Sequence, residues 1–487
     1  MTQGQSQRSQ PYRAPIAILG VPFDNVTTAE TLEIIAGMVA SGKPHYAATA
    51  NVDFIVQALE DVELRRILFD AHLVLADGQP IVWASKFFGN PLPERVTGSG
   101  LIPLLLELAE QRGWKVFFLG GTEQSVAAAA EKTLAKHPRL KLVGAYSPPF
   151  KPLLEMDHSD ILRRLHETKP DVLLVAFGCP KQEKWICMNL AAAGVPFSVG
   201  VGATIDFLAG TFKRAPGWMQ RTGTEWIYRM LQEPSRLVKR YGKDLRVFGV
   251  AILKQFWQMR GRDKSTTGGT ASVTADMPGI AIITAPARLD AAAAQAHQGA
   301  WQEAVAKADV IFDLADAEFV DSTGVGVLIR LRKLARESSH SFVLTGLRPL
   351  LAATFRTMKL EEFFSVETSV DAARVRVQGE HAAAHVGARI QEDFVMLEWQ
   401  GEIRAATAHE VAATTQGQLL TVPTGMSVIV DLANVRFVDS TGIGMMLKLK
   451  KELWRRNVKL TYRAPTEAVR NVLRMTKLES YLLEANA

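Results

Sequence analysis

A 17-residue segment occurs twice in this chain, and that repeat constrains the fold more than any other feature. Residues 310–326 (VIFDLADAEFVDSTGVG) and 428–444 (VIVDLANVRFVDSTGIG) are related by a constant offset of 118 positions. The match continues without a gap to 356–361 (RTMKLE) and 474–479 (RMTKLE). Two long copies, rather than three or more short ones, predict two similar domains of about 100 residues and exclude a solenoid.

Each copy is expected to fold as a small α/β domain. An apolar strand, at 310–314 or 428–432, leads through a short loop into a helix that begins at the Asp-Ser-Thr-Gly sequence. A second strand, at 342–345 or 459–462, and another helix follow. Strands that alternate with helices in this way predict a sheet covered by helices.

The remaining N-terminal part needs a domain of its own, because 487 residues exceed what a single core organises. Residues 261–276 (GRDKSTTGGTASVTAD) are rich in Gly, Ser and Thr and predict a flexible linker, and a second break is predicted at 379–387. The predicted order is a disordered N-terminus (1–14), a first domain (15–262) with a basic appendage (213–262), a linker (263–276), a first repeat (277–377), a linker (378–389) and a second repeat (390–487).

The first domain has the pattern of a parallel sheet that is buried on both faces. The runs 116–119, 172–177 and 197–201 are short and apolar, and each is followed by Gly. Helical patterns at 125–136 and 161–168 lie between them. Because ligands bind such sheets at the carboxyl ends of the strands, we expect the functional side chains in the loops that follow.

The net charge of +6 comes from one segment. Between positions 213 and 262 there are twelve basic and three acidic residues, interleaved with apolar residues at helical spacing, and Pro234 is expected to bend the segment. An anionic membrane surface, a nucleic acid, or a packed helical pair with a solvated basic face would each fit. No nucleic-acid motif accompanies the basic residues, so a nucleic-acid partner is not expected.

Cysteine content and hydropathy exclude several classes of protein. Two cysteines, Cys179 and Cys187, are too few for a disulfide framework or a four-ligand zinc site. Residues 1–14 lack the apolar centre of a signal peptide. The sequence contains no run of 18 uncharged apolar residues, so no membrane-spanning helix is predicted. A reducing, cytoplasmic location is expected.

Polar residues and glycines in the strand-end loops are the candidates for chemistry. Gly120 and Gly121 would let the backbone approach a phosphate, although such a pair after a strand is more often a plain tight turn. Asp77 follows an apolar strand, where a carboxylate can act as a general base or merely cap the next helix, and Asp206 has the same two interpretations. The lack of GxGxxG, GxxxxGK[ST] and DxD motifs in 1–262 argues against a dehydrogenase, a P-loop enzyme and the common metal-dependent sugar-nucleotide transferases.

As an ordered set, the loops resemble the WecG/TagA/CpsF family of bacterial glycosyltransferases. The motifs are TANVDF, LADGQPIVW, RVTGSGL, FFLGGT, FGCPKQEKW, VGVGATIDFLAG, KRAP and EWIYRMLQEPSRLVKRY, and the opening ILGVPFDNVT fits as well. The resemblance covers about 17–241 and implies a Rossmann-like parallel-sheet domain. It also implies inverting, metal-independent transfer of N-acetylmannosamine or a related sugar from a UDP-sugar to a polyprenyl-diphosphate-linked saccharide, without a cofactor.

The same resemblance implies roles for individual residues. Asp77 would be the catalytic base on the acceptor hydroxyl. The sugar pocket would be lined by Thr49, Asn51, Arg95 and Gln182. The nucleotide site would include Gly120, Gly121, Tyr146, Asp206 and, at the diphosphate, Arg214 or Arg221. Arginine side chains can compensate the charge of a departing UDP without a metal.

The repeated FVDSTG motif, at 319–324 and 437–442, resembles STAS domains (sulfate transporter and anti-sigma-factor antagonist). In that family the serine after the aspartate, here Ser322 or Ser440, opens a helix and can be phosphorylated by a partner kinase. A phosphate there would gain from free N–H groups but would repel the preceding aspartate and change a docking surface. The alternative is that the two hydroxyls only cap their helices.

Together these features predict a glycosyltransferase of cell-surface polysaccharide synthesis, peripheral on the inner face of the cell membrane. Its two STAS modules would regulate or localise it through a STAS-binding partner or kinase. The alternative is a non-catalytic scaffold that senses UDP-sugar and acts through its STAS domains. The presence of Thr49, Asn51, Asp77 and Arg95 favours the enzyme.

Overall fold

The computed structural model forms two compact units, each assembled from separate stretches of the chain. The first unit comprises Met1–Glu30, Val74–Arg95 and Leu245–Gly379, and the second comprises Thr31–Leu73, Val96–Asp244 and Glu380–Ala487. The structure describes residues 13–211, 215–217, 219, 225–232, 234–259, 271–361, 363–380, 386–390, 394–405, 407–419 and 427–483. The expected disorder of the N-terminus therefore concerns residues that are almost entirely outside this set.

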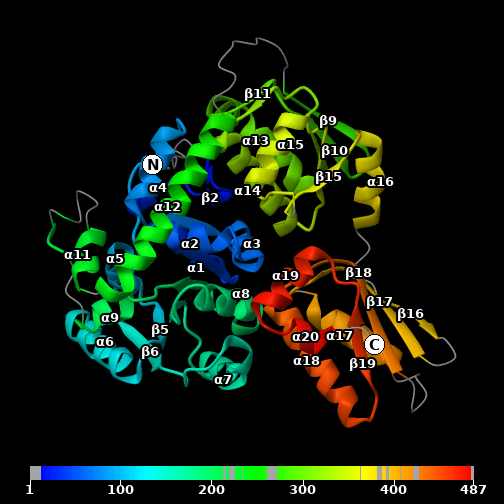
Figure 1. Ribbon diagram of the computed structural model, residues 1–487. Helices are drawn as coiled ribbons and strands as arrows, with labels where there is room; N and C mark the ends of the chain where they lie inside the picture. Colours follow the sequence, from blue (N-terminus) through cyan, green and yellow to red (C-terminus); the bar gives the residue numbers. More distant parts are fainter. Residues whose placement is uncertain are drawn as a thin grey trace, which may run out of the picture. The chain divides into compact units, whose positions relative to one another are not determined.

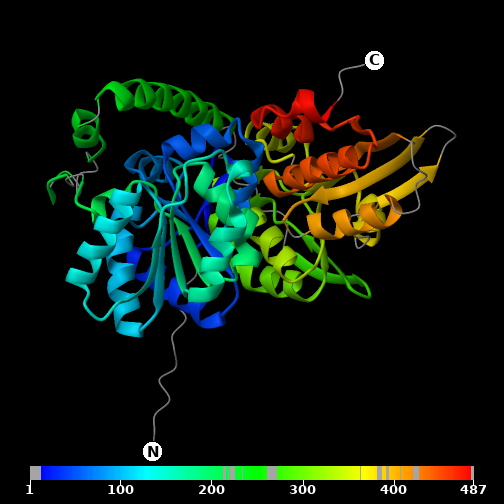
Figure 2. The ribbon, with the colours of Figure 1, turned by 90° about the horizontal axis from the view of Figure 1, so that it is seen from below.

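A six-stranded sheet with the order β4-β3-β8-β7-β5-β6 forms the centre of the N-terminal domain (Figures 1 and 2). The predicted parallel pairing is confirmed for β3 with β8, β8 with β7, β7 with β5 and β5 with β6. The strands are β3 (His45–Ala50), β4 (Leu73–Ala76), β5 (Lys115–Gly120), β6 (Lys141–Tyr146), β7 (Val172–Ala176) and β8 (Phe197–Gly200). The division between the two units crosses the chain within β4, after Leu73.

Helices connect these strands, and their starts follow from local capping chemistry. Thr122 caps α6, where its side chain accepts from the Ser125 N–H while the Ser125 hydroxyl accepts from the Thr122 N–H. Asp157 caps α7 in a similar way. The helices are α1 (Thr28–Ser41), α2 (Val52–Ala58), α3 (Val62–Asp70), α4 (Gln79–Phe87), α5 (Gly98–Arg112), α6 (Glu123–Lys136), α7 (His158–Thr168), α8 (Lys181–Ala193) and α9 (Thr204–Leu208).

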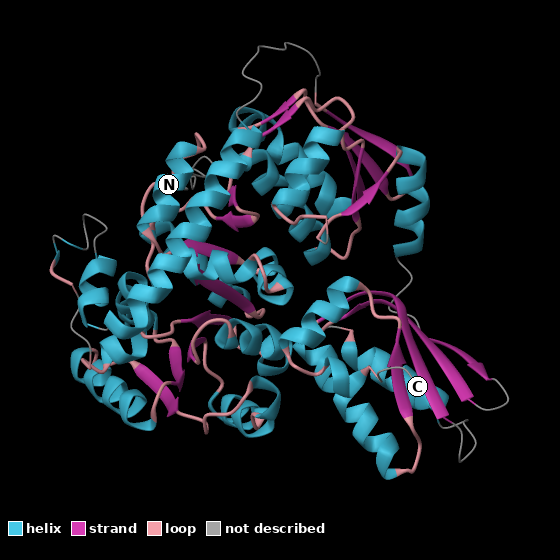
Figure 3. Cartoon of the chain, viewed as in Figure 1, coloured by secondary structure: helices cyan, strands magenta, loops and turns pink. Residues whose placement is uncertain are grey.

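The first repeat, in the first unit, is a five-stranded sheet with the order β15-β14-β12-β10-β9 (Figure 3). Strand β9 (Ser272–Met277) pairs with β10 (Ile280–Thr284) and falls within the predicted linker, so that prediction is wrong for these residues. Alternating apolar residues such as Val273 and Ala275 are a strand pattern that the Gly/Ser/Thr composition obscured. The other elements are β11 (Arg288–Leu289), α13 (Ala291–Lys307), β12 (Asp309–Asp313), β13 (Phe319–Val320), α14 (Ser322–Glu337), β14 (Phe342–Thr345), α15 (Pro349–Thr357), β15 (Ser365–Glu367) and α16 (Val370–Glu380).

The second repeat, in the second unit, has the strand order β16-β17-β18-β19 (Figure 3). Its long strand β18 (Ser427–Val438) corresponds to β12 and β13 of the first repeat joined without a break. Strand β16 (Val386–Ile390) lies in the second predicted linker and pairs with β17, so that linker is also shorter than predicted. The remaining elements are β17 (Phe394–Ile403), α17 (Ala408–Leu419), α18 (Ser440–Arg455), β19 (Leu460–Arg463), α19 (Glu467–Met475) and α20 (Glu479–Leu482).

The glycine of the repeated motif is required because a strand end approaches the helix closely in both copies. A Cβ on Gly324 would lie 2.1 Å from the Leu289 carbonyl oxygen. The equivalent Cβ on Gly442 would lie 2.7 Å from the Ile403 carbonyl oxygen. Both distances are shorter than real Cβ contacts, so no larger residue fits without moving the backbone.

The described residues of the basic appendage include the helices α11 (Glu225–Gln232) and α12 (Pro234–Met259). Pro234 is the first residue of α12, a position where its missing N–H costs no hydrogen bond, so the predicted bend falls where one helix ends and the next begins. Within the first unit, Gln255 on the buried face of α12 accepts from the Leu19 N–H at 2.8 Å and so fixes the turn between β1 (Ile16–Ile18) and β2 (Val21–Phe23). Among the helices that the structure describes, none is long and apolar enough to cross a bilayer.

Candidate functional site

At the carboxyl ends of β3 and β8, in the second unit, the structure brings Thr49 and Gln182 to the same strand end. The buried Thr49 hydroxyl donates to the Gly200 carbonyl oxygen at 3.4 Å. A Cβ on Gly200 would lie 2.5 Å from Gln182 Nε2, so the Gln182 side chain packs directly against this residue. Both residues therefore shape the loop that follows β8, at the sheet edge where the sequence placed a sugar pocket.

Gln182 orders two loops rather than projecting freely from them. Its Oε1 accepts from the Gly178 N–H and from the Gly202 N–H, each at 3.1 Å. Its Nε2 donates to Glu183 Oε1 at 2.7 Å. One side chain thus fixes the loops after β7 and β8, and its polar atoms are all occupied within the protein.

Glu183 is a buried carboxyl group that the sequence analysis did not single out. It is 2% exposed, and burial raises its pKa from 4.5 to about 7, although hydrogen bonds from Gln182 and Cys179 oppose that shift. Its Oε2 has no hydrogen-bond partner. A glutamate between polar residues at a helix start usually lies in solvent. The only sequence signal for a buried Glu183 is therefore its place in the motif FGCPKQEKW, which follows a strand end.

Asn51 caps the helix that follows β3. Its Oδ1 accepts from the Phe54 N–H at 3.2 Å, which leaves the side-chain amide NH₂ at the sheet edge. The half-buried side chain is therefore fixed by the backbone of α2 beside the strand end that carries Thr49. The structure places it next to the loop where the sequence predicted it.

Gly120 and Gly121 form the turn after β5. Their φ angles are +100° and +78°, a region that favours glycine, and the Gly121 N–H donates to the Ala176 carbonyl oxygen at 2.9 Å. The first turn of α6 follows immediately, so the turn leads into a helix N-terminus. This geometry suits the approach of a phosphate, as the sequence suggested.

Tyr146 ends β6 beside that turn, where the next residue, Ser147, donates to the Gly121 carbonyl oxygen at 2.7 Å. The Arg164 guanidinium lies 4.0 Å from the centre of the Tyr146 ring and therefore covers one of its faces. Burial raises the pKa of Tyr146, and its hydrogen bond to Asp160 raises this pKa further. The hydrogen bond from Arg164 is the largest cause that lowers the Asp160 pKa to about 2. The ring is thus held in one orientation by Arg164 and Asp160.

Asp206 lies in α9, which packs beside the glycine turn. A Cβ on Gly121 would lie 3.4 Å from Ile205 Cγ2, so the neighbouring residue of Asp206 contacts this corner. Ala203 is the N-cap of α9 and no side chain caps that helix, so the cap interpretation of Asp206 is wrong. The carboxylate is half-buried.

Asp77 and Arg95 belong to the first unit, and both are half-buried. Asp77 follows β4 directly, and Gly78, not Asp77, is the N-cap residue of α4. Asp77 is therefore not the N-cap residue of that helix, and its role as the base stays a prediction. Arg214 and Arg221 lie outside the residues that the structure describes.

The motif serines of the two repeats do not cap their helices, contrary to that alternative. Asp321 is the N-cap of α14 and accepts from Thr323 and Gly324, and Asp439 is the N-cap of α18 and accepts from Gly442. Ser322 is 1% exposed and Ser440 is 3% exposed. Both hydroxyls instead contact the N-terminal domain, a contact that no sequence pattern predicted.

Comparison with known proteins shows which families the two parts of the chain match. A model of the "Glycosyl transferase WecG/TagA/CpsF family" matches residues 16–262, and a model of the STAS domain matches 273–373 and 385–486. The chain is 30% identical over 226 residues to the N-acetylglucosaminyldiphosphoundecaprenol N-acetyl-beta-D-mannosaminyltransferase of Staphylococcus aureus (strain MW2). That similarity covers 46% of this chain and 87% of the relative.

Solved structures of STAS proteins are similar only at a low level. An anti-sigma-factor antagonist (STAS) domain protein from Planctomyces limnophilus is 20% identical with a TM-score of 0.21, covering 23% of this chain and 99% of that chain. The anti-sigma factor antagonist SpoIIAA in its unphosphorylated form is 18% identical with a TM-score of 0.19. That similarity covers 21% of this chain and 89% of SpoIIAA. TM-scores this low support no inference, so the STAS assignment rests on the family match.

Proposed function

Because this chain belongs to the WecG/TagA/CpsF family of glycosyl transferases and carries two STAS domains, we propose that it is an N-acetylmannosaminyltransferase-like enzyme. It transfers N-acetylmannosamine or a related sugar from a UDP-sugar to a polyprenyl-diphosphate-linked saccharide. The observation that carries this proposal is the similarity that spans 87% of a relative whose name states that sugar and a diphosphoundecaprenol acceptor. The reaction serves cell-surface polysaccharide synthesis.

In the proposed mechanism Asp77 removes the proton from the acceptor hydroxyl as that oxygen attacks the anomeric carbon of the donor. Inversion needs one base on the side opposite the leaving group, by analogy with inverting glycosidases. Thr49, Asn51, Arg95 and Gln182 bind or order the sugar, with Gln182 acting through the two loops that it fixes. The position of Asp77 directly after β4 and before the N-cap residue Gly78 supports its assignment as the base.

The departing UDP is stabilised at the glycine turn and by arginine. The turn at Gly120 and Gly121 lets the diphosphate approach the N-terminus of α6, with Asp206 beside it, and Arg214 or Arg221 neutralises its charge without a metal. Activity in the presence of a chelator is the expected result. Loss of activity that Mg²⁺ restores would contradict metal independence.

One assay separates the enzyme from a non-catalytic sensor. The full-length protein is incubated with different UDP-sugars and a short-chain lipid-diphosphate-GlcNAc analogue, and UDP release is measured with and without the acceptor. Acceptor-dependent release supports the transferase. Absence of such release with every donor, while UDP still binds, would favour the alternative of a scaffold that senses UDP-sugar through residues 16–262 and acts through its STAS domains.

Replacement of Tyr146 tests the nucleotide corner. Tyr146→Ala removes a stacking face and should raise the donor KM several-fold with little change in kcat, since base–aromatic stacking contributes about 1–3 kcal/mol. Tyr146→Phe keeps the ring but loses the bond to Asp160, and it should remain close to wild type. Equal donor KM values for the wild type and Tyr146→Ala would contradict the assignment.

A second part of the proposal concerns the membrane. In the first unit, α4 and α12 carry exposed apolar side chains. The two helices meet where Phe87 stacks on Phe256, with 3.9 Å between the ring centroids. Trp257 is 70% exposed and Trp83 is 57% exposed. We name this surface the aromatic patch, and its exposed members are Trp83, Phe87, Val250, Leu253 and Trp257. Exposed Lys86, Arg246 and Lys254 lie on the same two helices, a combination that suits an anionic lipid surface.

Removal of both patch tryptophans should weaken membrane binding. The variant Trp83→Ser with Trp257→Ser is expected to bind vesicles of phosphatidylglycerol and phosphatidylcholine at least about tenfold more weakly, because each buried aromatic contributes about 1.5–3 kcal/mol. The matched control is Trp454→Ser, which changes a tryptophan that is 77% exposed on α18. Vesicle flotation that is equal for all three proteins would contradict the membrane assignment.

The STAS domains are proposed to regulate or localise the enzyme through a protein partner or kinase. Ser322 and Ser440 are the proposed phosphorylation sites, but both are buried where the structure describes them. Phosphorylation of either serine therefore requires that its domain first separate from the N-terminal domain. A kinase would act on that open form.

A further inference from the structure

The second STAS domain buries the start of α18 against α3 and α8 of the transferase domain, within the second unit. The Ser440 N–H donates to Glu63 Oε1 at 2.6 Å, and the Ser440 hydroxyl donates to Glu63 Oε2 at 2.9 Å. Asp439, the adjacent cap, accepts from the Gly442 and Ala405 N–H groups. Both polar groups of Ser440 therefore bind one carboxylate of the transferase domain.

Glu63 is held from its other side by a cation on α8. Lys184 Nζ lies 2.9 Å from Glu63 Oε2 and 2.7 Å from Asp61 Oδ2. Burial alone would lower the Lys184 pKa, but Glu63 and Asp61 raise it, so the ammonium group stays charged. Asp61 also caps α3 by accepting from the Leu64 N–H. Serine, carboxylate and ammonium thus form a continuous chain from α18 to α8.

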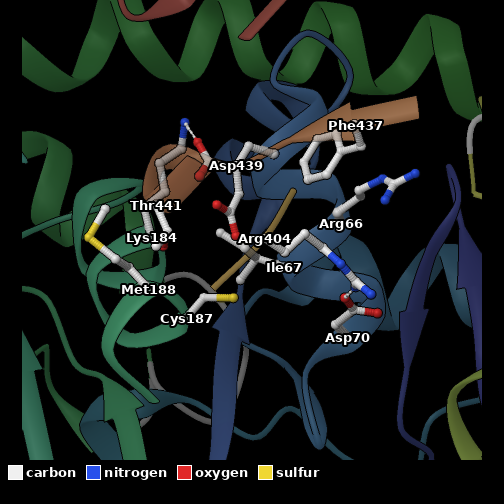
Figure 4. A pocket seen from close by; sticks show the side chains of 11 residues that line it. Arg66, Ile67, Asp70, Lys184, Cys187, Met188, Arg404, Phe437, Asp439 and Thr441 are labelled. Carbon is white, nitrogen blue, oxygen red and sulfur yellow. Dashed lines mark hydrogen bonds and ion pairs between the residues drawn. The ribbon is translucent and has the colours of Figure 1, made fainter. Parts of the chain in front are cut away.

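Apolar and ionic contacts surround that chain. Val62, the first residue of α3, belongs to the apolar core of the second STAS domain. Arg66 bonds Glu402 at 2.8 Å, and its guanidinium lies 4.1 Å from the centre of the Phe437 ring. Figure 4 shows the side chains of this interface, with Arg404 directed toward Asp70. The two domains are joined by a buried surface rather than by a tether alone.

The same contacts reach the proposed sugar site through the first turn of α8. Residues two apart on a helix point to opposite sides. Gln182 therefore faces the loops after β7 and β8, whereas Lys184 faces Glu63. The first turn of α8 is held on both sides, once by the loops of the site and once by the second STAS domain.

We propose that the second STAS domain positions α8 of the transferase domain through the contacts of Ser440, Glu63 and Lys184. A negative charge on Ser440 would break these contacts and release α8. The catalytic consequence rests on the proposed function, because it assumes that the loops fixed by Gln182 shape the donor site. The docking itself does not depend on that assumption.

The charge of the partner explains why Ser440 is the sensitive position. A negative group at Ser440 would meet Glu63 within hydrogen-bond distance, beside Asp439, and like charges in a buried contact repel strongly. In the first STAS domain the equivalent Ser322 hydroxyl contacts neutral groups, accepting from Gln255 Nε2 at 2.9 Å and donating to Met259 Sδ at 3.3 Å. The two copies therefore differ in what charge would do to their contacts.

The test compares four full-length proteins: the wild type, Ser440→Asp, Ser440→Asp combined with Glu63→Gln, and Ser322→Asp. Ser440→Asp should speed hydrogen exchange of the α8 amides and raise the donor KM, each about tenfold, because interaction energies between contacting groups reach this size. Adding Glu63→Gln supplies an amide that can donate to the new carboxylate, so both values should return to within about threefold of wild type. Ser322→Asp carries the same charge on the other unit and should leave α8 exchange unchanged.

Two results would overturn the proposal. The first is α8 exchange in Ser440→Asp that equals wild type. The second is a failure of Glu63→Gln to restore exchange, which would mean that Ser440→Asp damages the STAS domain itself. If the wild type shows no turnover with any donor, the proposed function fails, and the exchange measurements alone decide the docking.

Discussion

Asp77→Asn should lower acceptor-dependent UDP release by about 10²–10⁴, the usual contribution of a general base. The substitution keeps the size of the side chain but removes its ability to take a proton. Because Gly78, not Asp77, is the N-cap residue of α4, the helix start should survive the change. The expected result is a fall in kcat with UDP binding preserved, measured by release assays and by isothermal titration with UDP.

A matched control comes from another strand-end aspartate. Asp53 lies in the first turn of α2, where its Oδ2 accepts from Gln57 Nε2 at 2.8 Å. Asp53→Asn changes the same functional group at a position that is not assigned to the reaction, so turnover should stay within about twofold of wild type. If both variants lost activity equally, or if Asp77→Asn kept wild-type turnover, the base assignment would be wrong.

The sequence predicted the parallel sheet well because its strands are buried on both faces. Continuous apolar runs at 116–119 and 172–177 became β5 and β7 almost without change of bounds. The predicted linkers failed at strands β9 and β16, which are edge strands with few large apolar residues. An edge strand pairs on one side only and is partly exposed to solvent. It therefore needs fewer large apolar residues, and its composition resembles that of a loop.

Individual site residues could be placed in loops from sequence, but their hydrogen-bond partners could not. The position of Gln182 after a strand predicted a site residue, whereas its bonds to Gly178 and Gly202 depend on two loops that are distant in sequence. Glu63 was not singled out, because its role comes from Ser440, 377 positions away. Contacts of that range require the folded chain.

Glu183 gives the site a titratable group whose effect on stability can be predicted with its sign. Burial raises its pKa from 4.5 to about 7, so between these values the folded protein binds a proton that the unfolded chain has lost. Stability therefore falls as the pH rises through this range. The contribution is fully present below about 4.5 and is lost as the pH passes about 7, a total of about 3 kcal/mol for a shift of this size.

Glu183→Gln should remove that pH dependence, because glutamine resembles the protonated carboxyl group and cannot ionise. The variant should match the wild type in thermal midpoint near pH 5 and exceed it near pH 8, with the difference growing between these values. Asp321 and Asp439, whose pKa values burial raises to about 6, act in the same direction but are present in both proteins, so the difference isolates Glu183. A constant difference in midpoint from pH 5 to pH 8 would show that Glu183 is ionised throughout. It would then need a positive partner at the site, and a bound donor or an arginine from the basic appendage would have to supply that charge.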